Sequence, residues 1–252
     1  YLSGLGYLSK DETNFKKYFA DKDSQVVHLM SKEITRFHCI YWPILLKMLD
    51  LRLPSKILSH GWIVTKEGKM SKSLGNVIDP YDYIKKYGSD ALRYFIIKQL
   101  SYEKDGIFSQ DLFEEIYNGD LANNYGNMIT RVSGMIKKYF NNVVPICDVT
   151  KLDNLDKQVI DSHNKFIKSY QQFIETFNIN KLLEQTQDQY NLLNKYIEDK
   201  KPWVLAKDKT QLQILSNCLN ILFNTTYDLT TLLKPILIKT TLNVEKAWGI
   251  SI

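Results

Sequence analysis

Two short aliphatic runs separated by one helical stretch limit most strongly how this chain can fold. The first run covers 25–30, and the second is Lys56–His60, which 61–65 continue in extended form. Between them, apolar residues recur every three or four positions over 34–48, the spacing of an amphipathic helix, and Pro43 predicts a kink in it. This order predicts a βαβ unit of a parallel sheet, whose ligands bind at the carboxyl ends of the strands.

Helical signals replace the strand signals beyond residue 79. Pro80 suits the first turn of a short helix that Gly88 closes. Further helices are expected over 90–97, from 109, and over 119–140, 153–176, 178–199 and 208–233. The predicted fold class is therefore α/β, a partial Rossmann-like parallel sheet, followed by an all-α helical bundle.

The composition narrows the possible partners. The 33 Lys+Arg exceed the 28 Asp+Glu by 5, a mildly basic balance that is compatible with a nucleic-acid partner. Cys39, Cys147 and Cys218 lie far apart and form no CxxC pair, so we expect no zinc site, no other metal site and no disulfide framework. A reducing, cytoplasmic setting is favoured. No apolar run reaches the roughly 18 residues of a membrane span.

A loop with two lysines, 68–76, follows the second strand. Lys69 and Lys72 flank small hydroxyl residues between glycines, so the loop is either a solvated surface segment or a mobile clamp for a polyphosphate. Its string Lys-Met-Ser-Lys-Ser, at 69–73, resembles the signature loop of class I aminoacyl-tRNA synthetases. No Ser/His/Asp arrangement or close carboxylate pair competes with a reaction run by positioning and charge stabilisation.

The helix before this loop carries a possible pocket. His38 and Trp42 lie at i and i+4 and share a face with Ile34, and Phe37 lies beside them. A lone histidine on an apolar face is commonly a core residue, but these residues also form a slot suited to a small apolar side chain. The pattern Phe-His-x-x-x-Trp-Pro resembles the methionine pocket of methionyl-tRNA synthetases.

Other positions extend the resemblance. Tyr1 matches a tyrosine that closes over the methionine, and Glu33 stands where the family usually has Asp. His60, Gly61 and Trp62 resemble a His-Gly-aromatic stretch that passes beside the adenosine. Without the resemblance, the same three residues describe a bulged strand with a buried tryptophan.

A polar stripe marks the first long helix of the bundle. Asn127 and Arg131 lie at i and i+4, where they are either the wet side of a helix or donors for base edges. Trp203 follows Pro202 and is either a core anchor or a stacking platform for a base. Methionyl-tRNA synthetases have an Asn-x-x-x-Arg pair and a Pro-Trp in these places and read the anticodon with them.

The resemblance implies a function and a site. The enzyme would activate methionine with Mg²⁺-bound ATP and transfer it to tRNA(Met), with no membrane or DNA partner. The implied catalytic residues are Lys69 and Lys72. The implied ATP-binding residues are His60, Gly61, Trp62, Lys69, Met70, Ser71, Lys72 and Ser73. The implied methionine-binding residues are Tyr1, Ile34, Phe37, His38 and Trp42, and the anticodon-binding residues are Asn127, Arg131 and Trp203.

The same resemblance implies three regions. Residues 1–78 would be the C-terminal part of the catalytic domain, 79–108 a linking helical subdomain, and 109–252 the anticodon-binding domain. The family's His-x-Gly-His motif is absent, so we expect a partial chain that does not aminoacylate alone. Two alternatives stay open: a non-catalytic RNA-binding helical module derived from such an enzyme, or a class I synthetase for valine, leucine, isoleucine or cysteine.

Overall fold

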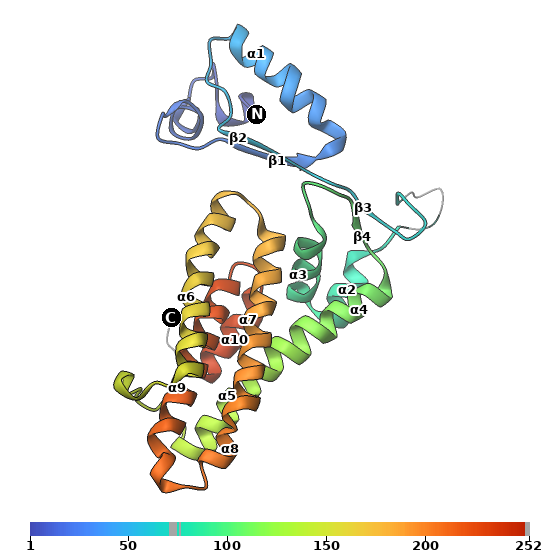
Figure 1. The fold of residues 1–252 in the computed structure, drawn as a ribbon. Helices are drawn as coiled ribbons and strands as arrows, with labels where there is room; N and C mark the ends of the chain where they lie inside the picture. Colours follow the sequence, from blue (N-terminus) through green and yellow to red (C-terminus); the bar gives the residue numbers. More distant parts are fainter. Residues whose placement is uncertain (71–74, 76, 250–252) are drawn as a thin grey trace. The chain divides into compact units, whose positions relative to one another are not determined.

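The computed structural model describes residues 1–70, 75 and 77–249. It has small parallel sheets near the start and a mostly helical remainder, which confirms the predicted fold class (Figure 1).

The chain divides into two compact units. We call Tyr1–Asn76 with Gln99–Ile107 the sheet unit, and Val77–Lys98 with Phe108–Ile252 the helical unit. Residues 99–107 contain a strand that pairs with a strand of the sheet unit. The division into regions 1–78, 79–108 and 109–252 stays a prediction.

Two pairs of parallel strands form the sheet unit. Strand β1, Val27–Ser31, pairs with β2, Lys56–His60, with Val27 opposite Lys56. Strand β3, Ile63–Val64, pairs with β4, Gly106–Ile107. Because β1 and β2 are parallel and a helix connects them, the predicted βαβ unit is confirmed. Short helical turns at Ser3–Leu5 and Phe15–Ala20 precede β1.

The connecting helix changes type along its length. A 3₁₀ turn at Lys32–Ile34 and a π-helical turn at Phe37–Tyr41 lead into α1, Trp42–Met48. Pro43 therefore lies in the first turn of α1, where its missing N–H costs little. The change of helix type occupies the place where a proline kink was expected.

The two faces of this helix differ from what its periodicity suggests. Leu46 is fully buried with Phe15 and Phe19, and Trp42 packs against this small core. The recurring apolar residues that define the periodicity are exposed, namely Ile34, Phe37, Tyr41, Leu45 and Met48. Within the part of the chain that the structure describes, this apolar face lies open.

The helical unit follows the predicted order. Its α-helices are α2 Pro80–Tyr87, α3 Ser89–Gln99, α4 Gln110–Ile116, α5 Asn127–Phe140, α6 Asn154–Glu175, α7 Ile179–Lys200, α8 Pro202–Leu205, α9 Leu212–Leu233 and α10 Ile238–Ala247. A π-helical segment, Tyr117–Gly126, joins α4 to α5, and 3₁₀ turns lie at Val149–Lys151 and Lys209–Gln211.

Local chemistry fixes several helix ends. The Asp79 side chain accepts a hydrogen bond from the Tyr81 backbone N–H at the start of α2, and Gly88, with φ of 87°, ends it. At the start of α6, Asp153 and Asp156 form a capping box in which each carboxylate accepts from the other's backbone N–H.

Long helices pack side by side to form the core of the helical unit. Helix α9 contacts α5, α6, α7 and α10, and α6 runs beside α7 (Figure 1). The fully buried side chains at this centre include Met128, Leu182, Leu183, Leu193, Ile197, Leu219, Leu222 and Leu229.

Candidate functional site

Four rings gather around the end of the chain at Tyr1. The Tyr1 hydroxyl lies 2.8 Å from Nε2 of His38, and the Trp42 indole donates to Nε2 of His28 at 3.0 Å. The ring centroid of Tyr1 is 4.7 Å from that of His28, 5.9 Å from His38 and 5.6 Å from Trp42. The structure therefore brings together three of the predicted methionine-binding residues with one additional histidine.

One hydrogen bond fixes the tautomer of His28. An indole N–H can only donate, so Nε2 of His28 must accept and carry no proton. Burial, and then the charge of His38, lower the pKa of His28 below its ordinary value. In His38, Nδ1 donates to the Ile34 carbonyl at 3.0 Å, and Nε2 forms a hydrogen bond with the Tyr1 hydroxyl. The geometry thus requires a neutral imidazole at His28.

The remaining predicted pocket residues stand apart from the four rings. Phe37 is 57% exposed and its ring packs edge-on against Tyr41 at 5.6 Å. Ile34 contributes its carbonyl to His38, while its side chain is exposed.

His28, which is not among the predicted site residues, belongs to the cluster. It alternates with exposed Leu29 along β1 and so faces the same way as buried Met30. That alternation was the available signal.

Two of the predicted ATP-binding residues, His60 and Gly61, lie at the carboxyl end of β2. A cavity of about 450 Å³ opens there. Its lining is Lys32, Ser59, His60, Gly61, Tyr102, Glu103, Lys104 and Asp105. Polar and charged groups therefore converge where ligands of parallel sheets bind.

Gly61 is required by the packing of the chain. A Cβ at this position would lie 2.3 Å from the carbonyl oxygen of Lys104. The Gly61 N–H also donates to the Ser101 carbonyl at 2.9 Å. The absence of a side chain at Gly61 therefore lets the backbone approach segment 101–105 closely.

Trp62 is the centre of a small charged cluster. Nζ of Lys32 lies 4.3 Å, and Nζ of Lys69 4.4 Å, from the centroid of its ring. Lys32 pairs with Asp105 at 2.7 Å, and Lys69 with Glu33 at 3.1 Å. Hydrogen bonds from Lys32 and then from the Trp62 backbone N–H lower the pKa of Asp105. Trp62 is thus fixed between the two lysines.

Part of the lysine loop can be placed. Lys69 and Met70 are described, and Lys69 reaches Trp62 and Glu33. Ser71, Lys72 and Ser73 lie outside the described residues.

The predicted anticodon residues lie in the helical unit. Arg131 donates from Nη1 to Asn194 at 3.0 Å and from Nη2 to Glu198 at 2.6 Å, both on α7. Asn127 is exposed one turn earlier on α5. Trp203 is 39% exposed at the start of α8, directly after α7 ends. Arg131 and Trp203 are therefore both connected to the last turns of α7.

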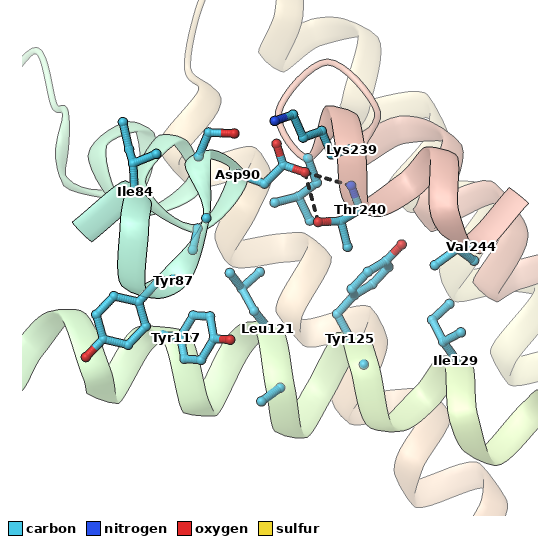
Figure 2. Close-up of a pocket in the computed structure, with 16 residues that line it drawn as sticks. Ile84, Tyr87, Asp90, Tyr117, Leu121, Tyr125, Ile129, Lys239, Thr240 and Val244 are labelled. Atoms are coloured by element: carbon cyan, nitrogen blue, oxygen red, sulfur yellow. Dashed lines mark hydrogen bonds between the residues drawn. The ribbon is translucent and has the colours of Figure 1, made fainter. Parts of the chain in front are cut away.

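A second cavity of about 450 Å³ lies within the helical unit and was not foreseen from the sequence (Figure 2). Tyr87, Tyr117 and Tyr125 line it together with aliphatic residues of α5 and α10. In the wall of this cavity, Oδ2 of Asp90 accepts from the backbone N–H and the hydroxyl of Thr240. Burial raises the pKa of Tyr125 to about 12.

Among the residues that the structure describes, no group of three His, Cys, Asp or Glu side chains is arranged to hold a metal ion. Among the helices that the structure describes, none combines the length and apolar character needed to cross a membrane.

Comparisons with known proteins agree with the sequence resemblance. The model of the family described as tRNA synthetases class I (M) matches residues 1–133. The chain is 54% identical over 239 residues to methionine–tRNA ligase of Ureaplasma parvum serovar 3, which is 95% of this chain and 46% of that protein. It is 42% identical over 249 residues to methionine–tRNA ligase of Mycoplasmopsis pulmonis, 99% of this chain and 48% of that protein.

A solved structure has the same fold. It is Mycobacterium tuberculosis methionyl-tRNA synthetase in complex with methionyl-adenylate, with a TM-score of 0.87 and 26% identity. The match covers 96% of this chain and 47% of that one. This chain thus spans about half the length of the proteins that it matches.

Proposed function

The chain belongs to the class I tRNA synthetases of the methionyl type, and we propose that it works as the C-terminal part of a methionine–tRNA ligase. One observation carries the proposal: Tyr1, His38 and Trp42 meet in the same unit that places Lys69 on Trp62. An aromatic pocket and a phosphate-binding lysine loop are the two parts that methionine activation requires.

The ring cluster would hold the methionine side chain. A thioether is polarizable and makes favourable contacts with aromatic rings, about 0.3–1.5 kcal/mol each. A neutral imidazole at His28 adds no positive charge to the cluster, which suits an apolar side chain. Tyr1, Ile34, Phe37, His38 and Trp42 are the proposed contacts, and His28 positions Trp42.

The cavity at the end of β2 would receive ATP, which brings its Mg²⁺ as part of the substrate. A carboxylate oxygen of methionine attacks the α-phosphorus, the bond to the β-phosphate oxygen breaks, and pyrophosphate leaves. Negative charge grows on the leaving group, and the ammonium groups of Lys69 and Lys72 would stabilise it. His60, Gly61 and Trp62 line the proposed adenosine side.

The helical unit would read the tRNA. The terminal adenosine hydroxyl attacks the carbonyl carbon of methionyl-adenylate, and AMP leaves. Asn127 and Arg131 offer donors for base edges, and Trp203 offers a partly exposed ring for stacking. The proposed partner is therefore tRNA(Met), recognised through its anticodon.

The exposed apolar face of the helix over 34–48 supports the view that this chain works within a larger enzyme. Soluble proteins rarely leave such a face open unless another element or partner covers it. The matched relatives are about twice as long as this chain.

The amino-acid specificity is tested in the full-length enzyme by ATP–pyrophosphate exchange with a panel of amino acids. We expect exchange with methionine only. Trp42→Ala should raise the KM for methionine about tenfold or more, because a ring of this size dominates a small apolar site. The KM for ATP should change little. Tyr18→Ala, on an exposed ring outside the cluster, is the matched control.

Two results would contradict the pocket. Exchange with valine, leucine, isoleucine or cysteine in place of methionine would assign a different class I enzyme. Equal losses for methionine and ATP in Trp42→Ala would reduce Trp42 to a core residue.

The anticodon role is tested separately, by aminoacylation kinetics. Arg131→Ala and Trp203→Ala should raise the KM for tRNA(Met) and leave ATP–pyrophosphate exchange intact. Lys138→Ala, on the same helix as Arg131, is the control. Unchanged tRNA kinetics would refute the role.

A further inference from the structure

A buried ion cluster lies at the end of α7, outside the residues assigned above. Nζ of Lys200 is 2.6 Å from Oδ1 of Asp156 and 2.7 Å from Oδ2 of Asp153. The hydroxyl of Tyr196 donates to the same Oδ1 of Asp156 at 2.6 Å. The side chains of Lys200 and Asp156 are only 4% and 1% exposed.

The cluster connects two helix ends. Lys200 is the last residue of α7, and Asp153 and Asp156 form the capping box at the start of α6. One ammonium group therefore holds the C-terminus of α7 against the N-terminus of α6. Burial opposes its charge, but hydrogen bonds to both carboxylates outweigh this and raise the pKa of Lys200 above its ordinary value.

The residues directly after Lys200 carry the proposed anticodon platform. Lys201 has φ of 47°, in the left-handed region, and its N–H donates to the Ile197 carbonyl at 3.0 Å. Pro202 then begins α8, and Trp203 is its second residue. In such a tight turn, the direction of α8 depends on where α7 ends, so fixing Lys200 also fixes Trp203.

Stability alone is a poor reason for this cluster. Removing two charges from water costs several kcal/mol per ion, and apolar replacements of buried ion pairs are commonly neutral or stabilising. What a buried ion pair can supply is a unique geometry, because its hydrogen bonds are satisfied in one arrangement only.

We propose that Lys200, Asp153, Asp156 and Tyr196 form a positioning device that holds Trp203 in place to stack on an anticodon base. The inference rests on the proposed anticodon role of Trp203. It assigns a role to four residues outside the proposed anticodon-binding set.

The test measures binding of an anticodon stem-loop RNA with a CAU loop to the 252-residue chain, by fluorescence anisotropy. Lys200→Met alone leaves the buried Asp156 carboxylate without its cation, although Asp153 is 54% exposed, and could unfold this end of the unit. The informative variant is therefore the double substitution Lys200→Met with Asp156→Asn, which removes both buried charges together. Its thermal midpoint should stay near that of the wild type.

The double variant should bind the RNA about tenfold more weakly, comparable to the loss of one stacking contact in Trp203→Ala. In the Trp203→Ala background, it should cause no further loss, because its effect acts through Trp203. The single substitution Lys200→Arg, which keeps the positive charge, should retain most of the RNA binding of the wild type. A purely structural role would not produce this dependence on Trp203.

The outcomes separate the two ideas. If Trp203→Ala binds the RNA like the wild type, the anticodon role fails and this inference fails with it. If Trp203→Ala weakens binding but the folded double variant does not, the inference alone is overturned. The inference is also overturned if the two losses add independently.

Discussion

The Asp90 carboxylate joins α3 to α10, and its removal is expected to destabilise the helical unit by about 3 kcal/mol. Asp90 is 7% exposed, and its Oδ2 accepts from the Thr240 backbone N–H at 2.7 Å and from the Thr240 hydroxyl at 2.8 Å. Hydrogen bonds to a charged group contribute about 1.5–3 kcal/mol each. Thr240 is only half-buried, so water can replace part of the lost hydrogen bonding. The loss of stability in Asp90→Ala should therefore lie near the lower end of the sum of the two hydrogen-bond contributions.

The expected shift is measurable by thermal unfolding, followed by circular dichroism of the helices. In a domain of this size, 1 kcal/mol corresponds to roughly 2–4 °C, so Asp90→Ala should lower the midpoint by about 6–12 °C. Thr240→Val keeps the backbone N–H and loses only the hydroxyl, so it should lower the midpoint by about 3–6 °C. Asp90→Asn should lie between the two, since its amide oxygen still accepts but carries no charge.

The double variant Asp90→Ala with Thr240→Val tests whether the two substitutions remove the same interaction. With Asp90 replaced by Ala, Thr240→Val should cost almost nothing further, because the partner of the hydroxyl is already gone. An Asp90→Ala midpoint within about 2 °C of the wild type would refute the estimate. Full additivity of the two substitutions would show that the Thr240 hydroxyl stabilises α10 without Asp90.

Three further predictions concern the sheet unit. Lys72→Ala in the full-length enzyme should slow adenylate formation about 10²–10³-fold with little change in methionine affinity, and wild-type pyrophosphate exchange would refute this. The pKa of His28 in the folded state lies below its value in the unfolded state, so the contribution of His28 to stability is present above the unfolded-state pKa and is lost as pH falls through the folded-state pKa. His28→Gln, which can still accept from Trp42, should therefore flatten the decline in thermal midpoint between neutral and acidic pH. An unchanged pH profile would count against this role of His28. Gly61→Ala should destabilise the sheet unit by about 1–3 kcal/mol through its clash with segment 101–105, measured by limited proteolysis, while Gly134→Ala, with open space around its Cβ, should be neutral or stabilising.

Local signals predicted the helix ends well. Pro80 begins α2 and Gly88 ends it, as predicted, and the helices expected over 153–176 and 178–199 are found as α6 and α7. These features depend on residues close together in the sequence, so pattern and capping rules reach them.

Contacts between residues far apart in the chain could not be predicted from the sequence. His28 lies 14 positions from Trp42, and Lys200 lies 47 from Asp153. A periodic pattern also indicates that a face is apolar without saying what covers it. The apolar face of the helix over 34–48 is exposed here, and its periodicity could not predict that. The roles of the predicted site residues stay predictions until kinetics test them.

The contacts of Lys69 bear on whether Glu33 matters where the family usually has Asp. The side chains of Lys69 and Glu33 are 56% and 60% exposed, and such a surface ion pair contributes about 0–1 kcal/mol to stability. The contact of Lys69 with Trp62 adds about 0.5–1 kcal/mol. Losing a preorganised charge in a transition state costs about 2.7–4 kcal/mol, so a leaving pyrophosphate would outcompete both contacts. With the role proposed for Lys69, Glu33 would offer it a resting position that the reaction can displace, and Glu33→Asp should leave the exchange rate nearly unchanged.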